Sequence, residues 1–360
     1  MTLKFDLQPS SAPRSDAERE AVLADPGFGV NFTDHMAVAT WTAADGWADS
    51  AVVPYAPFQL DPASAVLHYA QEIFEGMKAY RHADGSVWLF RPEKNAERFA
   101  VSARRLALPE LPVGSFVEAV EALVEADQAW VPAGGETSLY LRPFMFANEV
   151  FLGVRGARKV QFCVIASPAG SYFSGGVQPV QIWMSRDYTR AAPGGTGAAK
   201  CGGNYAASLV AQAEAAEHGC SQVLFTDAVE RKWVDELGGM NVYFVTADGQ
   251  LVTPALGTIL EGVTRDAILT LAPELGLTPV ERRVSLEEVL DGCRTGAIKE
   301  IFACGTAAVI TPIGALKDLD GTTAVGDGEP GPRTLELRQA LLDIQYGRRE
   351  DTHGWMHRVI

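Results

Sequence analysis

Runs of apolar residues predict several strands in the first 170 residues. The segments HMAVATW, SVWLF, TSLYLRPFMF and KVQFCVIASP are rich in β-branched, aromatic and other apolar residues. Asp84-Gly85 lies between MKAYRHA and SVWLF, and this dipeptide is a hairpin turn signal. We therefore expect a hairpin among these strands.

Apolar positions spaced by three or four residues predict two helices between the strands. One begins just after Pro92, and the other covers 114–131 with Ser115 as its cap. The first thirty or so residues show no lasting periodicity, so we expect an extended arm with a short helix around 17–24. Together these elements predict a small α/β domain over 1–170.

Gly and Pro cluster in PAGSYFSGGVQP, which predicts that residues 171–183 connect two domains. The second domain, 184–360, contains further helices and the short strand-like runs VQIWMS, QVLFTDA, KWVDEL, MNVYFV and IFACGTA. Asn204 is expected to cap a helix from 205 to about 218. Because the strands are too short and too irregularly spaced for a doubly wound sheet, we expect a mixed α and β fold.

Composition narrows the class of protein. Of the 360 residues, 47% are hydrophobic and 21% are charged, and no apolar run reaches the roughly eighteen residues needed to span a bilayer. The N-terminus lacks the apolar core of a secretory signal, which favours a cytoplasmic protein. A net charge of −15 opposes binding to nucleic acid. Five cysteines without a C-x-x-C pair indicate reduced thiols, and neither a disulfide framework nor a metal site is expected.

The stretch AAPGGTGAAKCGGNYAASL isolates Lys200 among small residues. A Walker A loop requires Gly-Lys-Ser/Thr, whereas Lys200 lies between Ala199 and Cys201. The Rossmann fingerprint requires glycine where Lys200 stands. An ordinary exposed loop lysine is one alternative. The lack of an adjacent carboxylate or bulky residue instead favours a lysine that forms a Schiff base with a carbonyl substrate or with pyridoxal phosphate.

Pyridoxal phosphate would need an anion site, a carboxylate for its ring nitrogen and a donor to its phenolic oxygen. Thr264 lies at the start of a predicted helix and Thr306 follows a predicted strand, and backbone N–H groups at either place suit a phosphate. Glu236, which precedes a Gly-Gly bend among apolar residues, is either the carboxylate or a surface turn residue. Tyr205, just after Lys200, is either the donor or a core tyrosine.

The chain contains, in this order, the motifs EIFEGMKAYR, FRPEKNAERF, LYLRPF, EVFLGVRGARK, AAKCGGNYAASL, VDELGGMNVYFV, LEGVTRDAIL and ACGTAAVITP. From about residue 30 to the C-terminal IQYGRRE, the sequence resembles branched-chain amino acid aminotransferases, which are pyridoxal phosphate enzymes of fold type IV. The resemblance implies a small N-terminal α/β domain, a larger C-terminal domain built around a pseudo-barrel, and a homodimer whose subunits help to close each other's active sites. It also implies transamination of L-leucine, L-isoleucine and L-valine with 2-oxoglutarate, giving branched-chain 2-oxo acids and L-glutamate.

The resemblance also implies a role for each site residue. Lys200 would hold pyridoxal 5′-phosphate covalently and transfer a proton, Glu236 would pair with its ring nitrogen, and Tyr205 would bond its phenolic oxygen. The residues expected to bind the phosphate are Arg98, Val263, Thr264 and Thr306. The residues expected to line the substrate pocket are Tyr69, Phe74, Tyr140, Arg142, Tyr172 and Ala307, the last through a backbone N–H to the α-carboxylate.

Arg142 suggests an anion site on its own, because an arginine within the apolar segment LYLRPF is costly unless it meets an anion or is well hydrogen-bonded. With tyrosine hydroxyls it would receive the second carboxylate of glutamate, while aromatic walls suit the branched side chains. The sequence departs from some family members in two places. Gly239 stands where they have threonine, and Ala308-Val309-Ile310-Thr311 stands where they have a redox C-x-x-C.

Three other classes of protein are alternatives. A D-amino acid aminotransferase, or a lyase acting on aminodeoxychorismate, would share the fold, but the residues over 69–80 and 140–142 favour the branched-chain enzyme. A cofactor-free lysine enzyme of the aldolase kind would lack the absorbance of bound pyridoxal phosphate. A non-catalytic binding protein with this fold would have that absorbance without transamination.

Overall fold

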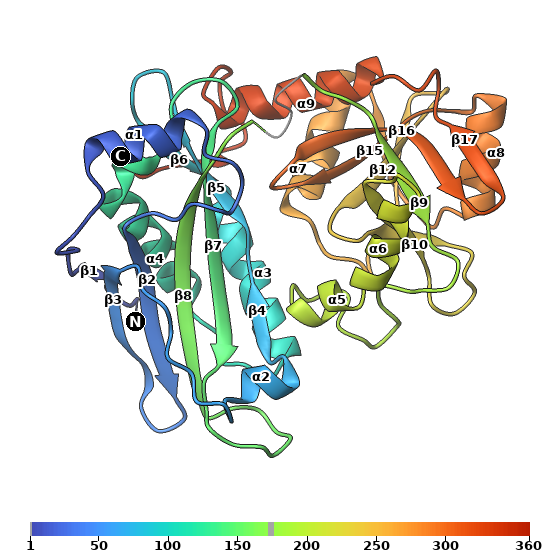
Figure 1. Cartoon of the computed structure of the whole chain (residues 1–360). Coiled ribbons are helices and arrows are strands. Elements are labelled where there is room, and N and C mark those ends of the chain that lie inside the picture. The colour runs from blue at the N-terminus through green and yellow to red at the C-terminus, as the bar shows by residue number, and fades with distance from the viewer. Residues whose placement is uncertain (1, 172–175) are drawn as a thin grey trace. The chain divides into compact units, whose positions relative to one another are not determined.

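The computed structural model describes residues 2–171 and 176–360 (Figure 1). These residues form two compact units. The first contains 2–171 with 199–202 and 344–360, and the second contains 176–198 with 203–343. Lys200 and the C-terminal segment therefore belong with the first unit by their contacts.

The first unit is built on a mixed sheet. Its strands are β1 (Asp6–Leu7), β2 (His35–Thr42), β3 (Gly46–Pro54), β4 (Glu72–Phe74), β5 (Met77–Arg81), β6 (Val87–Phe90), β7 (Ser138–Ala147), β8 (Lys159–Ala169) and β18 (Met356–Arg358). In the described residues the order across the sheet is β1-β3-β2-β8-β7-β5-β6-β18, and β4 pairs with β7 beside this path. The predicted hairpin at Asp84-Gly85 is confirmed, since β5 pairs antiparallel with β6 and Gly85 has φ 88°.

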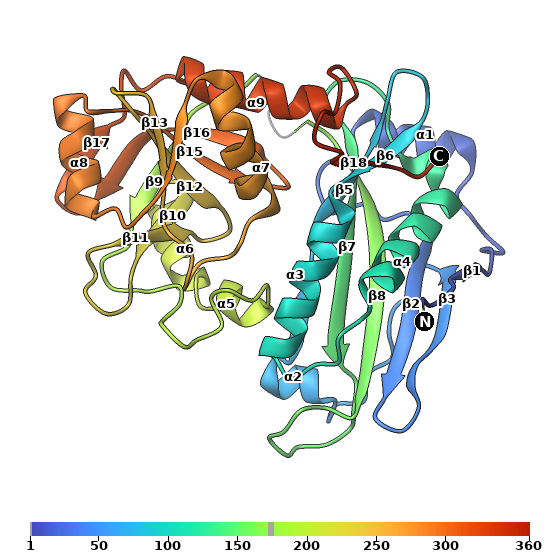
Figure 2. The same ribbon diagram turned by 180° about the vertical axis from the view of Figure 1, so that it is seen from behind.

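Two long helices cover one face of this sheet (Figure 2). The helices of the unit are α1 (Asp16–Ala24), α2 (Ala65–Tyr69), α3 (Pro92–Arg105) and α4 (Val113–Ala126), and a 3₁₀ turn follows at Gln128–Trp130. Phe99 of α3 meets Phe116 of α4 and Phe162 of β8, with ring centres 5.3 and 5.8 Å apart. These three buried rings join both helices to the sheet because apolar area is removed from water on all sides.

The start of α4 differs from the prediction. The helix begins at Val113, and Ser115 lies within its first turn instead of capping it. The Ser115 hydroxyl accepts a hydrogen bond from the backbone N–H of Leu3, 3.0 Å away, so a distant segment of the chain takes the oxygen that the cap would have used.

The second unit contains another mixed sheet. Its strands are β9 (Val180–Met184), β10 (Gln222–Thr226), β11 (Val234–Leu237), β12 (Asn241–Thr246), β13 (Gln250–Thr253), β14 (Thr278–Glu281), β15 (Ile298–Gly305), β16 (Val309–Asp318) and β17 (Gly321–Ala324). Among the described residues the order is β11-β10-β9-β16-β15-β12-β13-β14, with β17 on β16. Buried aliphatic residues from these strands form its core, as expected for strands covered on their faces.

The helices of the second unit are α5 (Gly202–Ala206), α6 (Leu209–Glu217), α7 (Val263–Leu271), α8 (Leu286–Thr295) and α9 (Pro332–Gln345). The single helix predicted after Asn204 is two helices, and Asn204 lies inside α5. Its side chain bonds Thr196 instead, accepting from the Thr196 hydroxyl at 2.6 Å and donating to the Thr196 carbonyl at 2.8 Å. These bonds tie the glycine-rich loop to α5.

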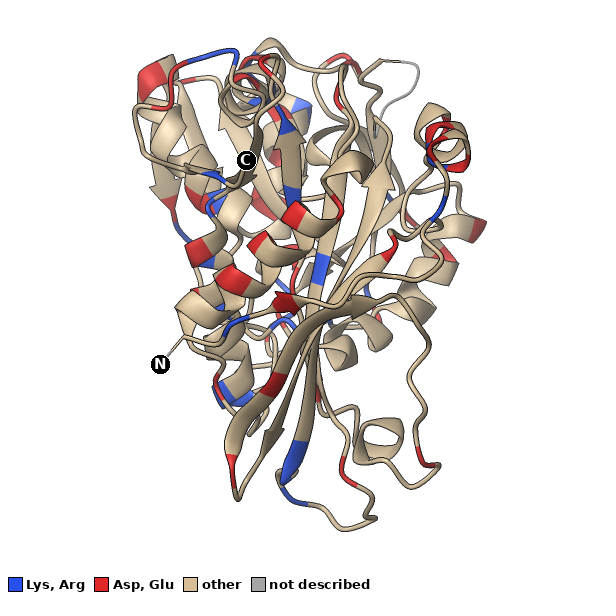
Figure 3. Ribbon diagram, turned by 90° about the vertical axis from the view of Figure 1, so that its left-hand side faces the viewer, with Lys and Arg blue, Asp and Glu red and all other residues tan. Residues whose placement is uncertain are grey.

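Figure 3 shows that residues of both charge signs are distributed over the ribbon, and the acidic residues, 45 in the sequence, outnumber the 30 basic ones. Within residues 2–171 and 176–360, none of the helices is both long enough and apolar enough to cross a membrane. The five cysteines are free thiols, and Cys201, next to Lys200, is buried in the core of the first unit.

Candidate active site

Residues of the first unit bind the backbone of Lys200 at both its N–H and its carbonyl. Its N–H donates to the hydroxyl of Ser102 at 2.9 Å, and its carbonyl accepts from the N–H of Phe74 at 3.0 Å. Two residues later, the N–H of Gly202 donates to the carboxylate of Glu72. The lysine loop is thus fixed against α3 and β4.

The amine of Lys200 lies over an aromatic ring. Its Nζ is 4.6 Å from the centre of the Phe74 ring, and the side chain is half-buried. Burial raises the pKa of the neighbouring Glu72, while the Gly202 N–H and the charge of Arg142 act in the opposite direction. The Phe74 ring thus covers one side of the Lys200 amine.

Arg142 stacks on the same ring. The guanidinium carbon lies 4.8 Å from the centre of the Phe74 ring and 5.4 Å from that of Tyr140, and Nη2 donates to the Tyr140 hydroxyl at 3.2 Å. The Nε of Arg142 is buried and has no hydrogen-bond partner among the described residues. A buried guanidinium N–H that lacks an acceptor suits an anionic ligand, and the binding of an anion by Arg142 stays a prediction.

Strand geometry explains why these side chains meet. Tyr140 and Arg142 are two residues apart on β7, so their side chains leave the same face of the strand. Phe74 enters from β4, which pairs antiparallel with β7. A side chain at Gly76 would overlap the Tyr140 hydroxyl, so only glycine leaves Tyr140 in this position.

Tyr69, another pocket residue predicted in this unit, is not part of this cluster. Tyr69 ends α2, is exposed, and donates from its hydroxyl to the carbonyl of Leu152. Tyr172 lies outside the described residues. The structure therefore brings together Lys200, Phe74, Tyr140 and Arg142.

Arg98 is held by a carboxylate that the sequence did not identify. Its Nε and Nη2 donate to the two carboxylate oxygens of Glu75 at 2.8 and 2.7 Å. Glu75 is completely buried and also accepts from the side chain of Asn95 at 2.8 Å. This bidentate pair fixes the plane of the guanidinium and leaves Nη1 outside the pairing with Glu75.

Glu236 lies on β11 in the second unit and is buried. Its Oε1 is 2.7 Å from Nη1 of Arg190 and accepts from the N–H of Leu260 at 3.1 Å. Its Oε2 accepts from the side chain of Asn241 at 3.2 Å. The alternative of a surface turn residue therefore does not hold for Glu236, which is a buried carboxylate with a fixed orientation.

The predicted phosphate donors of the second unit lie at the N-terminus of a helix and in a turn between two strands. Val263 and Thr264 are the first two residues of α7, where N–H groups point out of the helix. Thr306 and Ala307 occupy the turn between β15 and β16. Asn241, which bonds Glu236, connects the two places. It pairs with Cys304 at the end of β15, and its side chain donates to the carbonyl of Leu260, just before α7, at 3.0 Å. The start of α7 and the β15–β16 turn therefore lie near the same end of the sheet as Glu236.

Tyr205 belongs to α5 and is half-buried. A Cβ placed on Gly239 would be 3.8 Å from the Tyr205 ring, which is ordinary van der Waals contact. Gly239 therefore has room for a small side chain beside the Tyr205 ring.

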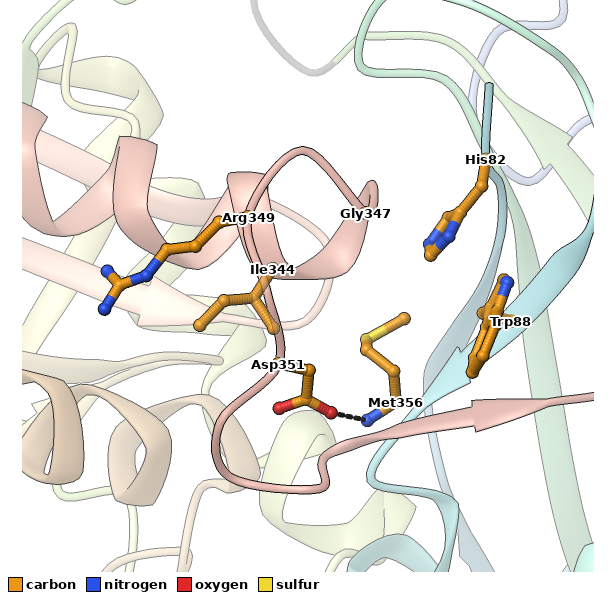
Figure 4. A pocket seen from close by; sticks show the side chains of 7 residues that line it. All are labelled: His82, Trp88, Ile344, Gly347, Arg349, Asp351 and Met356. Carbon is orange, nitrogen blue, oxygen red and sulfur yellow. Dashed lines mark hydrogen bonds between the residues drawn. The ribbon is translucent and has the colours of Figure 1, made fainter. Parts of the chain in front are cut away.

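Seven residues line a cavity of about 340 Å³ in the first unit (Figure 4). His82 and Trp88 stack with their ring centres 5.2 Å apart, and the C-terminal segment supplies the other walls. The lining consists of His82, Trp88, Ile344, Gly347, Arg349, Asp351 and Met356. None of these is a predicted site residue, so this cavity is separate from the Lys200 cluster.

Five residues around the predicted site were not predicted from the sequence. Each acts on a partner distant in the sequence or through its lack of a side chain: Glu75, Gly76, Ser102, Arg190 and Asn241. Of these, Glu75 alone could have been suspected from the sequence, because a charged residue inside the apolar run EIFEGMK needs a partner.

Comparisons with known proteins show the class to which the fold belongs. Residues 72–316, more than half of the chain, match the family model described as amino-transferase class IV. The structure is similar to that of the Escherichia coli branched-chain amino acid aminotransferase, with a TM-score of 0.75 and 29% identity over 90% of this chain and 100% of that one. The fold is therefore that of fold type IV enzymes, as predicted.

Two further proteins narrow the family. The chain is 61% identical, over 99% of both chains, to a probable branched-chain-amino-acid aminotransferase of Streptomyces coelicolor. It is also similar to the branched-chain amino acid aminotransferase of Thermobaculum terrenum in its PLP form, with a TM-score of 0.73 and 28% identity over 89% of this chain and 98% of that one. The chain belongs to the class IV aminotransferases and, within them, to the branched-chain-amino-acid aminotransferases.

Proposed function

We propose that the protein transfers the amino group of L-leucine, L-isoleucine and L-valine to 2-oxoglutarate, with pyridoxal 5′-phosphate as cofactor. The products are the branched-chain 2-oxo acids and L-glutamate. The observation that carries this proposal is the cluster of an amine, a guanidinium and two aromatic rings formed by Lys200, Arg142, Phe74 and Tyr140.

This cluster has the two kinds of surface that the two substrates need. The rings of Phe74 and Tyr140 give an apolar wall for a branched side chain. The buried Nε of Arg142, which has no acceptor among the described residues, and the Tyr140 hydroxyl suit the second carboxylate of glutamate.

The donor set fits pyridoxal 5′-phosphate. The second unit offers a buried carboxylate at Glu236 for the ring nitrogen, N–H groups of Val263 and Thr264 at the start of α7 for the phosphate, and the hydroxyl of Tyr205 for the phenolic oxygen. Thr306 would add a further phosphate donor, and Ala307 an N–H for the α-carboxylate. From the first unit, Lys200 would hold the cofactor covalently and Arg98 would bind its phosphate.

When bound, this cofactor supplies an aldehyde for the amino group and a ring that accepts electrons from the substrate α-carbon. The protein's residues would then control the proton. The Lys200 amine would take the proton from the α-carbon of the amino donor. In the second half-reaction it would return a proton to the α-carbon of the new amino acid. Arg190 and Asn241 would hold the Glu236 carboxylate in a fixed orientation toward the ring nitrogen.

We also propose that the protein works as a homodimer. The segment after β7 exposes three aliphatic side chains, Val150, Leu152 and Val154, with exposed fractions of 57, 63 and 87%. Apolar side chains gathered on one loop favour burial against another subunit. Sedimentation at micromolar concentration should give twice the mass of one chain, and a monomer would contradict this part of the proposal.

The activity can be tested with purified protein and a panel of amino donors. Leucine, isoleucine and valine should form glutamate from 2-oxoglutarate in the presence of pyridoxal 5′-phosphate, while D-amino acids should not. Lys200→Ala should abolish both the reaction and the absorbance of the covalently held cofactor. A protein that is active without the cofactor, or inactive with every branched donor, would refute the proposal.

A further inference from the structure

Helix α3 carries two groups that face the proposed site. Ser102 is fully buried and accepts from the N–H of Lys200 at 2.9 Å, and Arg98 forms the buried pair with Glu75. The two residues are four apart in the helix, so they share one face and are separated by about 6 Å along the axis. One rigid element therefore positions both the lysine and the guanidinium.

Two consecutive residues at the end of β4, Phe74 and Glu75, also bind Lys200 and Arg98. The N–H of Phe74 holds the Lys200 carbonyl at 3.0 Å, and the next residue, Glu75, holds Arg98. The lysine peptide is thus bonded at its N–H by α3 and at its carbonyl by β4. Both bonds are made by the backbone of Lys200, and neither involves its side-chain amine.

We propose that Ser102 is a positioning residue for Lys200, and that α3 thereby fixes the distance between the lysine and Arg98. A ligand that is joined to Lys200 and also bound by Arg98 gains from this fixed distance, because no ordering cost is incurred on binding. This inference rests on the proposed function, in which pyridoxal 5′-phosphate is such a ligand.

Ser102→Ala removes the acceptor and little volume. In the variant without bound ligand, the Lys200 loop can relax, so that the Lys200 N–H donates a hydrogen bond to water. When the lysine is joined to a phosphate-anchored ligand, the loop must return to its place and the N–H is buried without a partner. Pyridoxal 5′-phosphate should therefore bind about five- to a hundredfold more weakly.

Pyridoxamine 5′-phosphate provides the comparison, because it carries the same ring and phosphate but has no aldehyde to join to the lysine. Its dissociation constant, measured by quenching of tryptophan fluorescence, should change by less than about twofold in Ser102→Ala. In a Lys200→Ala background, Ser102→Ala should likewise leave the binding of pyridoxal 5′-phosphate unchanged. A role in folding alone would weaken both compounds and would persist without the lysine.

Ser115→Ala is a matched control. Ser115 is also a fully buried helical serine of the first unit that accepts a backbone N–H, that of Leu3 at 3.0 Å. It should leave the binding of both compounds unchanged. Equal weakening of the two compounds by Ser102→Ala, or no weakening of either, would overturn the inference. Wild-type protein that binds neither compound would overturn the proposed function with it.

Discussion

Nη1 of Arg190 lies 2.7 Å from Oε1 of Glu236, and both side chains are almost completely buried. Arg190 Nη1 is also 3.4 Å from the carbonyl of Gly197, so the guanidinium connects the carboxylate to the glycine-rich loop. A charge at this depth needs its partner, since the protein interior replaces the water that would otherwise solvate it.

Arg190→Gln should destabilise the protein by about 3–5 kcal/mol, because it leaves the Glu236 carboxylate buried without its counter-charge. Urea denaturation of Arg190→Gln, Glu236→Gln and the double variant would measure this. The double variant should lose much less stability than the sum of the single losses. Strict additivity would contradict a direct interaction between the two charges.

Glu75→Gln should cost a similar amount, about 3 kcal/mol, because the buried guanidinium of Arg98 loses its bidentate acceptor. Glu97→Gln is the matched control on the same helix, since Glu97 pairs with Lys94 at the surface and more than half of its side chain is exposed. The control should change the free energy of unfolding by less than about 0.5 kcal/mol. Equal losses in the two variants would contradict the assignment.

Gly76→Ala should reduce transamination while leaving the fold intact. The new methyl group would overlap the Tyr140 hydroxyl, and the tyrosine would swing away from Arg142. We expect kcat/KM to fall by about a hundredfold, since a shift of this size at a substrate pocket has such an effect. Gly170→Ala, whose Cβ would make only ordinary contacts at 3.6 Å, should be nearly as active as the wild type.

Asp235 should make stability depend on pH. Burial raises its pKa to about 6 from the ordinary value of 3.8, although the Thr258 hydroxyl and Arg190 act in the opposite direction. The folded state therefore holds this proton more tightly than the unfolded chain, and stability should fall as the pH rises from 3.8 to about 6.

Asp235→Asn should remove this dependence. Denaturation at pH 7.5 should show a more stable variant, whereas near pH 3.5 the variant and the wild type should be alike. A variant that is less stable than the wild type at pH 7.5 would show that the Asp235 charge is stabilising, which is the reverse of what its burial indicates.

Local signals in the sequence were sufficient for many elements. The turn at Asp84-Gly85 and the start of α7 depend on neighbouring residues, so the pattern predicted both. Ser115 and Asn204 had the right residue type for helix caps, but each found a tertiary partner, Leu3 and Thr196, that its neighbours in sequence could not reveal.

The contacts around the site were beyond such signals. Ser102 is 98 residues from Lys200, and Glu75 is 23 residues from Arg98, so no periodicity relates them. Motif resemblance identified the residues expected to touch the cofactor and the substrate. It did not identify the residues that hold those side chains in place, because their partners are set by the pairing of β4 with β7 and by the packing of α3.

The strand order of the first sheet has a consequence for how the protein is made. Its two edges are β1, near the start of the chain, and β18, near its end. During synthesis on the ribosome the edge at β6 has no neighbour until residues 356–358 emerge, and an open strand edge can pair with other chains. The second unit, whose strands all precede β18, can be completed while the first still waits for its last strand.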